Sequence, residues 1–529
     1  MESIYRIQRY QVRCHASARG AAWPLASACG LKSTSRIARW SSASQHPVMT
    51  VADQSRPSVD FHQGTVRLFG LSPRFVDKTL ADIPLAWDER EDCFRGDAMH
   101  ADAIRRALDR SLAGGFDWRV GRDAGAAEFR SLSIKDLRQM TLRADQQQAV
   151  EAFETGGRRG LIVMPTGTGK TVVAIELMIR NRCSTLIVVP VRDLMYQWHA
   201  KILEATGIDA GLIGDGVHRV SPISVTTYDS AAIHMPRIGD RFQLIIFDEV
   251  HHLAGPWRSD AARMSIAAFR LGLTATPPGD NERKVRLHDL VGPTLYQQSI
   301  AEASGTSLAD YSVHRIAVRL TDEEQHRYRD YGQQIQKFVF EQKTIDPKFK
   351  WEDTYALSAA TDEEPDRARD AVLAMRAFRL KRQIEEHADA KLRMLEDLFR
   401  LHCDESIIVF TGSNVMARKI STRFLVPCLL SHCGKKERRQ WLEGFAEGRY
   451  RVLVANRVLD EGVDLPEVKT AIVLGGLSSQ RQAIQRLGRV LRKGRGGRRA
   501  KLYEVVVEDT REVTRSRDRR RNEAYRQNR

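Results

Sequence analysis

The segment LIVMPTGTGKTVVAIELM, residues 161–178, decides the fold of this chain. Its apolar start predicts a buried strand, and the apolar residues that recur at helical spacing after Lys170 predict a helix. The glycines between them let backbone N–H groups turn inward around phosphate oxygens, at the positive end of the helix dipole. The pattern predicts a nucleotide-phosphate loop made of Pro165, Thr166, Gly167, Thr168, Gly169, Lys170 and Thr171. In this loop Lys170 is expected to bridge the β- and γ-phosphates of ATP, and the Thr171 hydroxyl to coordinate Mg²⁺.

A second segment, LIIFDEVHHLAG at residues 244–255, places two acids beside two histidines after an apolar run. Alone it is compatible with a metal site, a hydrolase dyad or the magnesium-holding end of a strand. The phosphate loop upstream favours the third interpretation: Asp248 holds Mg²⁺ through water, and Glu249 polarises the attacking water. Adjacent histidines that follow the acids lack the spacing of a zinc-binding HExxH helix. His251 is expected to sense the γ-phosphate.

Working outward, short apolar runs alternate with amphipathic stretches from about residue 135 to 310. Strands that alternate with helices predict a parallel sheet covered on both faces. A mostly helical, charged region follows at 320–385, and strand-like runs return between 388 and 510, which predicts a second α/β unit. Residues 60–130 predict a small α+β domain, and residues 511–529 form a basic tail.

The composition limits the classes of partner. The net charge of +16 favours a polyanion such as nucleic acid. No apolar run approaches the roughly 18 residues of a membrane span, so no membrane partner is expected. Seven scattered cysteines support neither a disulfide framework nor a zinc ribbon and indicate an intracellular protein. Residues 1–48 carry one acid, Glu2, and resemble a transit peptide in composition. A disordered extension, or a true start at Met49, is favoured over organellar targeting, and the expected location in a prokaryote is the cytoplasm or nucleoid.

Three segments together, DEVH, LGLTATP and QAIQRLGRVLR, resemble the DExH-box superfamily-2 helicases, and within these the XPB/Rad25 DNA helicases. The compact PTGTGKT loop, with Met164 where the general pattern has glycine, is a variant used by such motors. The resemblance implies an α/β fold of two tandem RecA-like (P-loop NTPase) domains with parallel sheets. It also implies a DNA-recognition-like N-terminal domain and a thumb-like helical insert at 320–385.

The resemblance also implies roles for individual residues. Gln146 would contact adenine, and Gln485, Arg489 and Arg492 would act in catalysis from the second domain. The nucleotide cleft between the domains would be lined by Asp460, Glu461, Gly462 and Asp464. The remaining residues would contact the nucleic acid: Pro190, Arg192, Thr226 and Thr227 in the first domain, and Arg379 and Arg382 in the insert.

These roles imply an ATP-dependent DNA helicase or translocase, moving 3′ to 5′ on duplex, forked or single-stranded DNA, in DNA repair and with a partner nuclease. Two alternatives stay open: a DExH motor acting on RNA or in a restriction system, and a nucleotide-switched DNA clamp that does not unwind. The Arg-Glu-Asp element that the family has after TATP is not found in PPGDNERK, residues 277–284, which leaves open translocation without unwinding.

Overall fold

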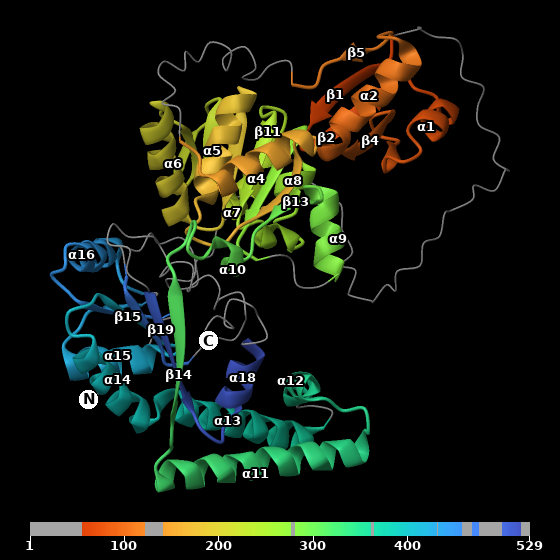
Figure 1. Ribbon diagram of the computed structural model, residues 1–529. Helices are drawn as coiled ribbons and strands as arrows, with labels where there is room; N and C mark the ends of the chain where they lie inside the picture. Colours follow the sequence, from red (N-terminus) through yellow and green to blue (C-terminus); the bar gives the residue numbers. More distant parts are fainter. Residues whose placement is uncertain are drawn as a thin grey trace, which may run out of the picture. The chain divides into compact units, whose positions relative to one another are not determined.

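The computed structural model describes residues 56–121, 141–276, 281–360, 364–430, 432–456, 468–475 and 500–519, arranged around three β-sheets (Figure 1). One sheet is small and mostly antiparallel, and the other two are covered by helices, one of them wholly parallel and the other parallel except for one edge strand. No helix among the described residues is long and apolar enough to cross a membrane.

The N-terminal domain is a five-stranded sheet in the order β3-β4-β2-β1-β5, packed against two helices. Its strand β2 alternates between buried and partly exposed residues, as in a sheet with one face on a core. Pro73 begins α1 after the Ser72 cap, and Ala113, with φ +45°, ends α2. The elements are β1 Ser58–His62, β2 Thr65–Phe69, α1 Pro73–Thr79, β3 Leu85–Asp88, β4 Cys93–Asp97, the short 3₁₀ helix η1 Ala98–His100, α2 Ala101–Leu112 and β5 Asp117–Trp118.

The first α/β domain holds eight strands in the order β13-β6-β12-β11-β7-β10-β8-β9, all parallel to their neighbours except β9. Its elements are α4 Ala144–Thr155, β6 Arg159–Val163, α5 Lys170–Asn181, β7 Thr185–Val189, α6 Arg192–Thr206, β8 Gly211–Gly214, β9 Val217–Arg219, β10 Ile223–Thr227, α7 Tyr228–Ile238, β11 Leu244–Asp248, η2 Val250–Ala254, α8 Asp260–Arg263, β12 Phe269–Thr274, α9 Asn281–Leu290, β13 Thr294–Gln297 and α10 Ile300–Ala303.

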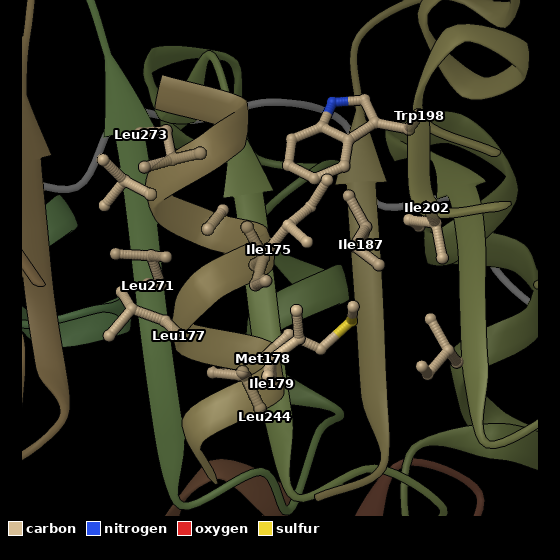
Figure 2. Packing of buried hydrophobic residues seen from close by; sticks show 14 of the residues in the cluster. Ile175, Leu177, Met178, Ile179, Ile187, Trp198, Ile202, Leu244, Leu271 and Leu273 are labelled. Atoms are coloured by element: carbon tan, nitrogen blue, oxygen red, sulfur yellow. The ribbon is translucent and has the colours of Figure 1, made fainter. Parts of the chain in front are cut away.

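The central strands of this sheet are buried on both faces because their sequences are continuous apolar and β-branched runs. One face packs against α4, α5 and α6, and the other against α7, α8 and η2. Figure 2 shows the first of these layers, where Ile175 and Met178 of α5 meet Ile187 of β7 and Leu271 of β12. Trp198 of α6 lies at one end of the layer, with its nitrogen turned away from the aliphatic side chains.

The second α/β domain has six parallel strands in the order β14-β19-β18-β15-β17-β16. Its elements outside the insert are β14 Tyr311–Val318, α14 Asp389–Leu401, β15 Ile407–Phe410, α15 Asn414–Phe424, β16 Cys428–Leu429, α16 Lys435–Ala446, β17 Val452–Ala455, β18 Thr470–Val473, β19 Ala500–Val507 and α18 Arg511–Arg519. Strand β14 pairs with β19 along its whole length, so this sheet begins before the helical insert.

The helical insert leaves the second domain after β14 and returns to it at α14. It consists of two long helices that lie side by side (Figure 1) and two short ones: α11 Asp322–Ile345, η3 Trp351–Asp353, α12 Thr354–Ala359 and α13 Pro365–His387. Alanines of α13, among them Ala371 and Ala374, allow close approach to Phe338 of α11. The predicted α/β fold with two RecA-like domains and parallel sheets is confirmed.

Candidate functional site

The predicted site residues of the first domain follow neighbouring strands at one edge of the parallel sheet. Thr274 at the end of β12 pairs with Val163 of β6, and Asp248 at the end of β11 pairs with Leu273. The phosphate loop after β6 and the acids after β11 therefore flank the carboxyl end of β12. Ligands of open parallel sheets bind at this edge.

The phosphate loop adopts the left-handed backbone that its glycines allow. Gly167 has φ +91° and Gly169 has φ +85°, and Gly169 is the residue that precedes α5. Lys170 opens the helix, is buried, and donates from Nζ to the Met164 carbonyl at 3.1 Å. The Thr166 hydroxyl is buried and has no hydrogen-bond partner among the described residues. An unsatisfied hydroxyl in a glycine-rich loop at a helix N-terminus fits an anionic ligand.

Gln146 of α4 lies directly against this loop. Its Nε2 donates to the Thr168 carbonyl at 3.0 Å, and its Oε1 accepts from the Arg143 backbone N–H at 3.1 Å. An added Cβ on Gly169 would lie 2.4 Å from Gln146 Nε2. The neighbouring Asp145 accepts from Ser307 Oγ at 2.5 Å. Burial alone would raise the pKa of Asp145, but the bond from Ser307 and the nearby Arg143 lower it below its ordinary value.

The two acids are buried at the end of β11. Asp248 Oδ2 accepts from the Trp198 indole N–H at 2.8 Å, and Oδ1 accepts from the Glu249 backbone N–H at 3.0 Å. Glu249 has φ +48°, a left-handed conformation that turns its side chain out of the strand direction. Its Oε2 is buried and accepts no hydrogen bond from any described residue. Such a carboxylate oxygen is available to take a proton.

His251 connects the acids to the adjacent strand. Its Nδ1 lies 3.6 Å from Glu249 Oε2 and 3.5 Å from the Thr274 hydroxyl. The Thr274 carbonyl accepts from the Met164 N–H at 3.0 Å, at the start of the phosphate loop. His252 points elsewhere: its Nδ1 lies 3.0 Å from Arg258. His251 is therefore the histidine that adjoins both the acid and the loop.

The donor set fits ATP with Mg²⁺. The loop offers backbone N–H groups, a lysine and the half-buried Thr171, and Asp248 offers a carboxylate. Among the described residues no group of three or more His, Cys, Asp or Glu side chains forms a self-sufficient metal site. Mg²⁺ keeps waters and uses one or two protein ligands together with phosphates, so the Thr171 hydroxyl and the Asp248 carboxylate are groups that could hold it.

The predicted nucleic-acid contacts of the first domain lie farther along the same edge, after β7 and at the end of β10. Arg192 begins α6, and its exposed guanidinium pairs with Asp215 at 2.6 Å. Thr226 is fully buried, and its hydroxyl donates to the Ile213 carbonyl at 2.8 Å. Thr227 caps α7 by accepting from the Ser230 N–H. The structure thus places Pro190 and Arg192 at the sheet edge and gives both threonine hydroxyls internal partners.

The helical insert presents a basic groove. Arg379 is exposed on α13, whereas Arg382 pairs with Glu386 at 2.9 Å and borders the groove. The groove continues as a cavity of about 470 Å³, where Trp351 lies 5.2 Å from Phe378, ring centre to ring centre. Basic residues from three helices and from the loop before η3 line its two parts: Lys343, Lys350, Lys381, Arg382, Arg511 and Arg515. Sequence reasoning missed Lys350, Trp351 and Arg511 because they come from separate elements.

The other predicted residues of the second domain, namely Asp460, Glu461, Gly462, Asp464, Gln485, Arg489 and Arg492, lie outside the described residues. Asn456, at the end of that domain's β17, is described, and its amide donates to Asn414 Oδ1 at 2.6 Å. Sequence reasoning also missed Trp198. The spacing of Met195, Trp198 and Ile202 marks the buried face of α6, but it does not reveal a partner on β11.

The chain is similar to known protein families and known proteins over much of its length. Residues 139–279 match the family described as the res subunit of type III restriction enzymes, and residues 390–494 match the helicase conserved C-terminal domain. The DNA 3'-5' translocase XPB2 of Sulfurisphaera tokodaii is 39% identical over 387 residues, which cover 73% of this chain and 86% of the relative. The DNA 3'-5' helicase XPB of Kineococcus radiotolerans is 28% identical, over 70% of this chain and 60% of the relative.

Among solved structures, the Hef helicase domain of Pyrococcus furiosus superposes with a TM-score of 0.52. The match covers 73% of this chain and all of the other, at 17% sequence identity. At that identity the likeness shows a shared fold of two α/β domains.

Proposed function

The chain belongs to the XPB/Rad25 family of helicases and translocases, and from that premise we propose that it is an ATP-dependent DNA motor that translocates on or unwinds DNA in the 3′ to 5′ direction. The observation that carries the proposal is the meeting of the phosphate loop, Asp248 and Glu249 at one sheet edge. The names of the relatives, a DNA 3'-5' translocase and a DNA 3'-5' helicase, support DNA as the track.

The extent of the match differs between relatives. The chain spans 86% of the translocase from Sulfurisphaera tokodaii but only 60% of the helicase from Kineococcus radiotolerans. The translocase is also the more similar of the two in sequence. Translocation is therefore the activity that we place first, with unwinding as its extension.

ATP binding is proposed to rest on the loop and on α4. Gln146 holds the loop through Thr168 and would contact the adenine. The backbone N–H groups from Gly167 to Thr171 and the Lys170 ammonium bind the phosphates. Lys170 now donates to the Met164 carbonyl, and this bond is expected to break when phosphates take its place. Bound ATP with Mg²⁺ supplies a phosphoryl electrophile whose charge the cation neutralises.

Hydrolysis is proposed to use the acids at the end of β11. Asp248 and the Thr171 hydroxyl would hold Mg²⁺, Asp248 through water. Glu249 would orient the attacking water and accept its proton at Oε2, the buried oxygen that no described residue satisfies. His251, within 3.6 Å of this oxygen and 3.5 Å of Thr274, would relay the state of the site to the β12 end.

The second domain is proposed to complete the site. Gln485, Arg489 and Arg492 would reach the γ-phosphate, because two guanidiniums supplied from a second domain stabilise phosphoryl charge only when the cleft is closed. Gly462 and Asp464 would line the same cleft. Closure with ATP and reopening after hydrolysis would convert turnover into movement along DNA.

The nucleic-acid track is proposed to run along the sheet edge that carries Pro190, Arg192 and the ends of β10, and over the basic groove of the insert with Arg379 and Arg382. Lysines and arginines bind phosphates, and aromatic rings such as Trp351 offer a surface for bases. DNA repair is the proposed process, and a partner nuclease stays a prediction.

A specific observation supports a second candidate function. The match of residues 139–279 to the restriction-subunit family favours a restriction-type translocase. That match covers a shorter segment than the 387 residues shared with the XPB2 translocase, so we rank it second. A motor that acts on RNA and a clamp that does not move are the remaining alternatives.

The test is steady-state ATP hydrolysis at fixed salt with no nucleic acid, duplex DNA, forked DNA, single-stranded DNA and RNA in parallel. Stimulation by forked or single-stranded DNA supports a helicase, and stimulation by duplex alone supports a translocase. A preference for RNA contradicts the choice of DNA. Hydrolysis that no nucleic acid stimulates contradicts the motor and favours the clamp.

A further inference from the structure

Asp248 is held at three of its atoms. The Trp198 indole donates to Oδ2 at 2.8 Å, the Glu249 N–H donates to Oδ1 at 3.0 Å, and the Tyr228 hydroxyl donates to the main-chain carbonyl at 3.0 Å. Both aromatic residues are enclosed: Trp198 is 2% exposed and Tyr228 is 0% exposed. The residue proposed to hold Mg²⁺ is thus fixed by two donors that are distant in sequence: Trp198 holds its carboxylate, and Tyr228 holds its main-chain carbonyl.

The two donors come from the elements that carry the predicted nucleic-acid contacts. Trp198 lies on α6, which begins at Arg192 just after Pro190. Tyr228 is the first residue of α7 and directly follows Thr226 and Thr227. Each element therefore connects an expected DNA contact at the sheet edge to the same acid.

The rings of Trp198 and Tyr228 are held in place by the residues packed around them. The Trp198 ring packs against the core layer that includes Ile187 and Ile202 (Figure 2), so its nitrogen moves with α6. An indole has one N–H and no acceptor, so it fixes the direction from which Oδ2 is approached. Tyr228 stacks on Phe247, the residue before Asp248, at 6.3 Å between ring centres. A shift of either helix has to displace the acid or break a buried hydrogen bond.

We propose that Trp198 and Tyr228 are positioning residues that transmit nucleic-acid binding at α6 and α7 to the Mg²⁺-holding carboxylate of Asp248. This inference rests on the proposed function, because it assumes DNA at the sheet edge and Mg²⁺ at Asp248. Groups that hydrogen-bond to a metal-holding carboxylate and so orient it strongly affect metal affinity and turnover. Coupling between the DNA site and the Mg²⁺ site also requires a structural element whose equilibrium both ligands shift, and the contacts of Trp198 and Tyr228 with Asp248 would supply it.

The experiment compares Trp198→Phe and Tyr228→Phe with the native chain. Each change removes one hydrogen-bond donor and keeps an aromatic ring. Three quantities are measured: the stimulation of ATP turnover by DNA, the Mg²⁺ concentration that gives half-maximal rate, and the affinity for a fluorescent ATP analogue. Trp441→Phe is the matched control, because Trp441 lies on α16 and donates only to Glu437 of the same helix among the described residues.

In Trp198→Phe the stimulation by DNA is expected to fall at least about fivefold and the half-maximal Mg²⁺ concentration to rise about three- to tenfold. The analogue affinity should stay within twofold. Mn²⁺, which binds such sites more tightly than Mg²⁺, should restore part of the rate. Tyr228→Phe should show the same pattern more weakly. In the Asp248→Asn background, Trp198→Phe should add little, because both changes act on one interaction.

The outcomes separate the two proposals. A native chain that DNA does not stimulate contradicts the proposed function itself. If the native chain is stimulated but both variants keep its stimulation and Mg²⁺ requirement within twofold, the positioning role is overturned. If Trp198→Phe fails to fold, Tyr228→Phe decides alone, since it removes a single oxygen. Equal loss of rate with unchanged Mg²⁺ requirement would assign both residues to core packing and overturn the proposal.

Discussion

Lys391 and Glu512, 121 positions apart, form an ion pair of 2.7 Å in which the lysine side chain is 0% and the glutamate side chain 6% exposed. Lys391 also donates to the carbonyls of Glu385, at the end of the helical insert, and of Leu474, after β18. Glu512 accepts in addition from the Val507 N–H at 3.0 Å. The pair therefore joins α13, α14, β18 and α18.

Lys391→Met is expected to destabilise the second α/β domain by about 3–5 kcal/mol, because it leaves a buried carboxylate without its cation. Segment-resolved hydrogen exchange should show the loss around β18, β19 and α18. Burial raises the pKa of Glu512, so protonation should relieve part of the loss at low pH. The control is Lys419→Met: this lysine pairs with Asp389 at the surface, where such a change costs about 0–1 kcal/mol. Equal effects of the two changes would contradict the prediction.

Glu249→Gln is expected to leave ATP binding intact while turnover falls by at least about a hundredfold, because the amide cannot take a proton from water. The change keeps the size of a side chain whose Oε2 accepts no hydrogen bond from the described residues, so folding should not suffer. Binding of a fluorescent ATP analogue and single-turnover hydrolysis measure the two effects separately. Turnover within tenfold of the native rate would refute the proposed role of Glu249.

Much of the first domain could be predicted because its signals are local. Continuous apolar and β-branched runs such as 185–189 can bury all of their side chains only between two layers of helices, and these runs form the central strands of the sheet. The glycines of the phosphate loop need positive φ, and Gly167 and Gly169 have it. Since parallel strands place their carboxyl ends together, the approach of the acids to the loop followed from the strand assignment.

Features that depend on long-range partners could not be predicted. β14 lies before a 66-residue helical insert, yet it completes the second sheet by pairing with β19, nearly 200 positions away. The first turns of the basic tail form α18, where Glu512 and Ser516 are buried by partners elsewhere in the chain. The bond from Trp198 to Asp248 belongs to the same class: spacing indicates a buried face but not the atom that it meets.

Gly169→Ala is expected to weaken ATP binding at least about tenfold. An added Cβ would lie 2.4 Å from Gln146 Nε2, so Gln146 would have to leave the Thr168 carbonyl. Gly157→Ala is the control: Gly157 also has positive φ, at +80°, but nothing lies within 4 Å of an added Cβ. Both changes should cost roughly 1–2 kcal/mol of backbone strain. Titration with a fluorescent ATP analogue should show weakened binding in the first variant alone; a matching loss in Gly157→Ala would assign the effect to strain.

Cys183 is expected to resist alkylation in the native protein. It is buried between α5 and β7, and burial raises the pKa of its thiol to about 12. The thiolate is the reactive form, so at neutral pH the reagent lacks both access and a nucleophile. Cys403 is exposed and should react first. Peptide mass spectrometry after timed iodoacetamide treatment measures both sites in one sample. Denaturant should make the two rates similar, and fast labelling of Cys183 in the native protein would contradict its buried position.

The stability of the second domain is expected to fall as the pH drops below about 6.5. Burial lowers the pKa of His402, although the nearby Glu405 opposes this, and burial also lowers the pKa of His387. The unfolded chain then binds protons at a pH where the folded chain does not. The free energy of unfolding that these histidines contribute is complete above the pKa they have in the unfolded chain. It is lost as the pH falls through the lower pKa they have in the folded chain.

His402→Gln tests this dependence. His402 is buried against Tyr503, with Nε2 2.9 Å from its hydroxyl, and an amide can keep that bond. Removing one titrating group should reduce the slope of unfolding free energy against pH by up to about 1.4 kcal/mol per pH unit between pH 5 and 6.5. Denaturant unfolding at several pH values, monitored through hydrogen exchange of the β19 amides, measures the slope. His288→Gln is the control, since that side chain lies in solvent on α9 of the other domain. A slope that His402→Gln leaves unchanged would show that His402 does not carry the acid sensitivity.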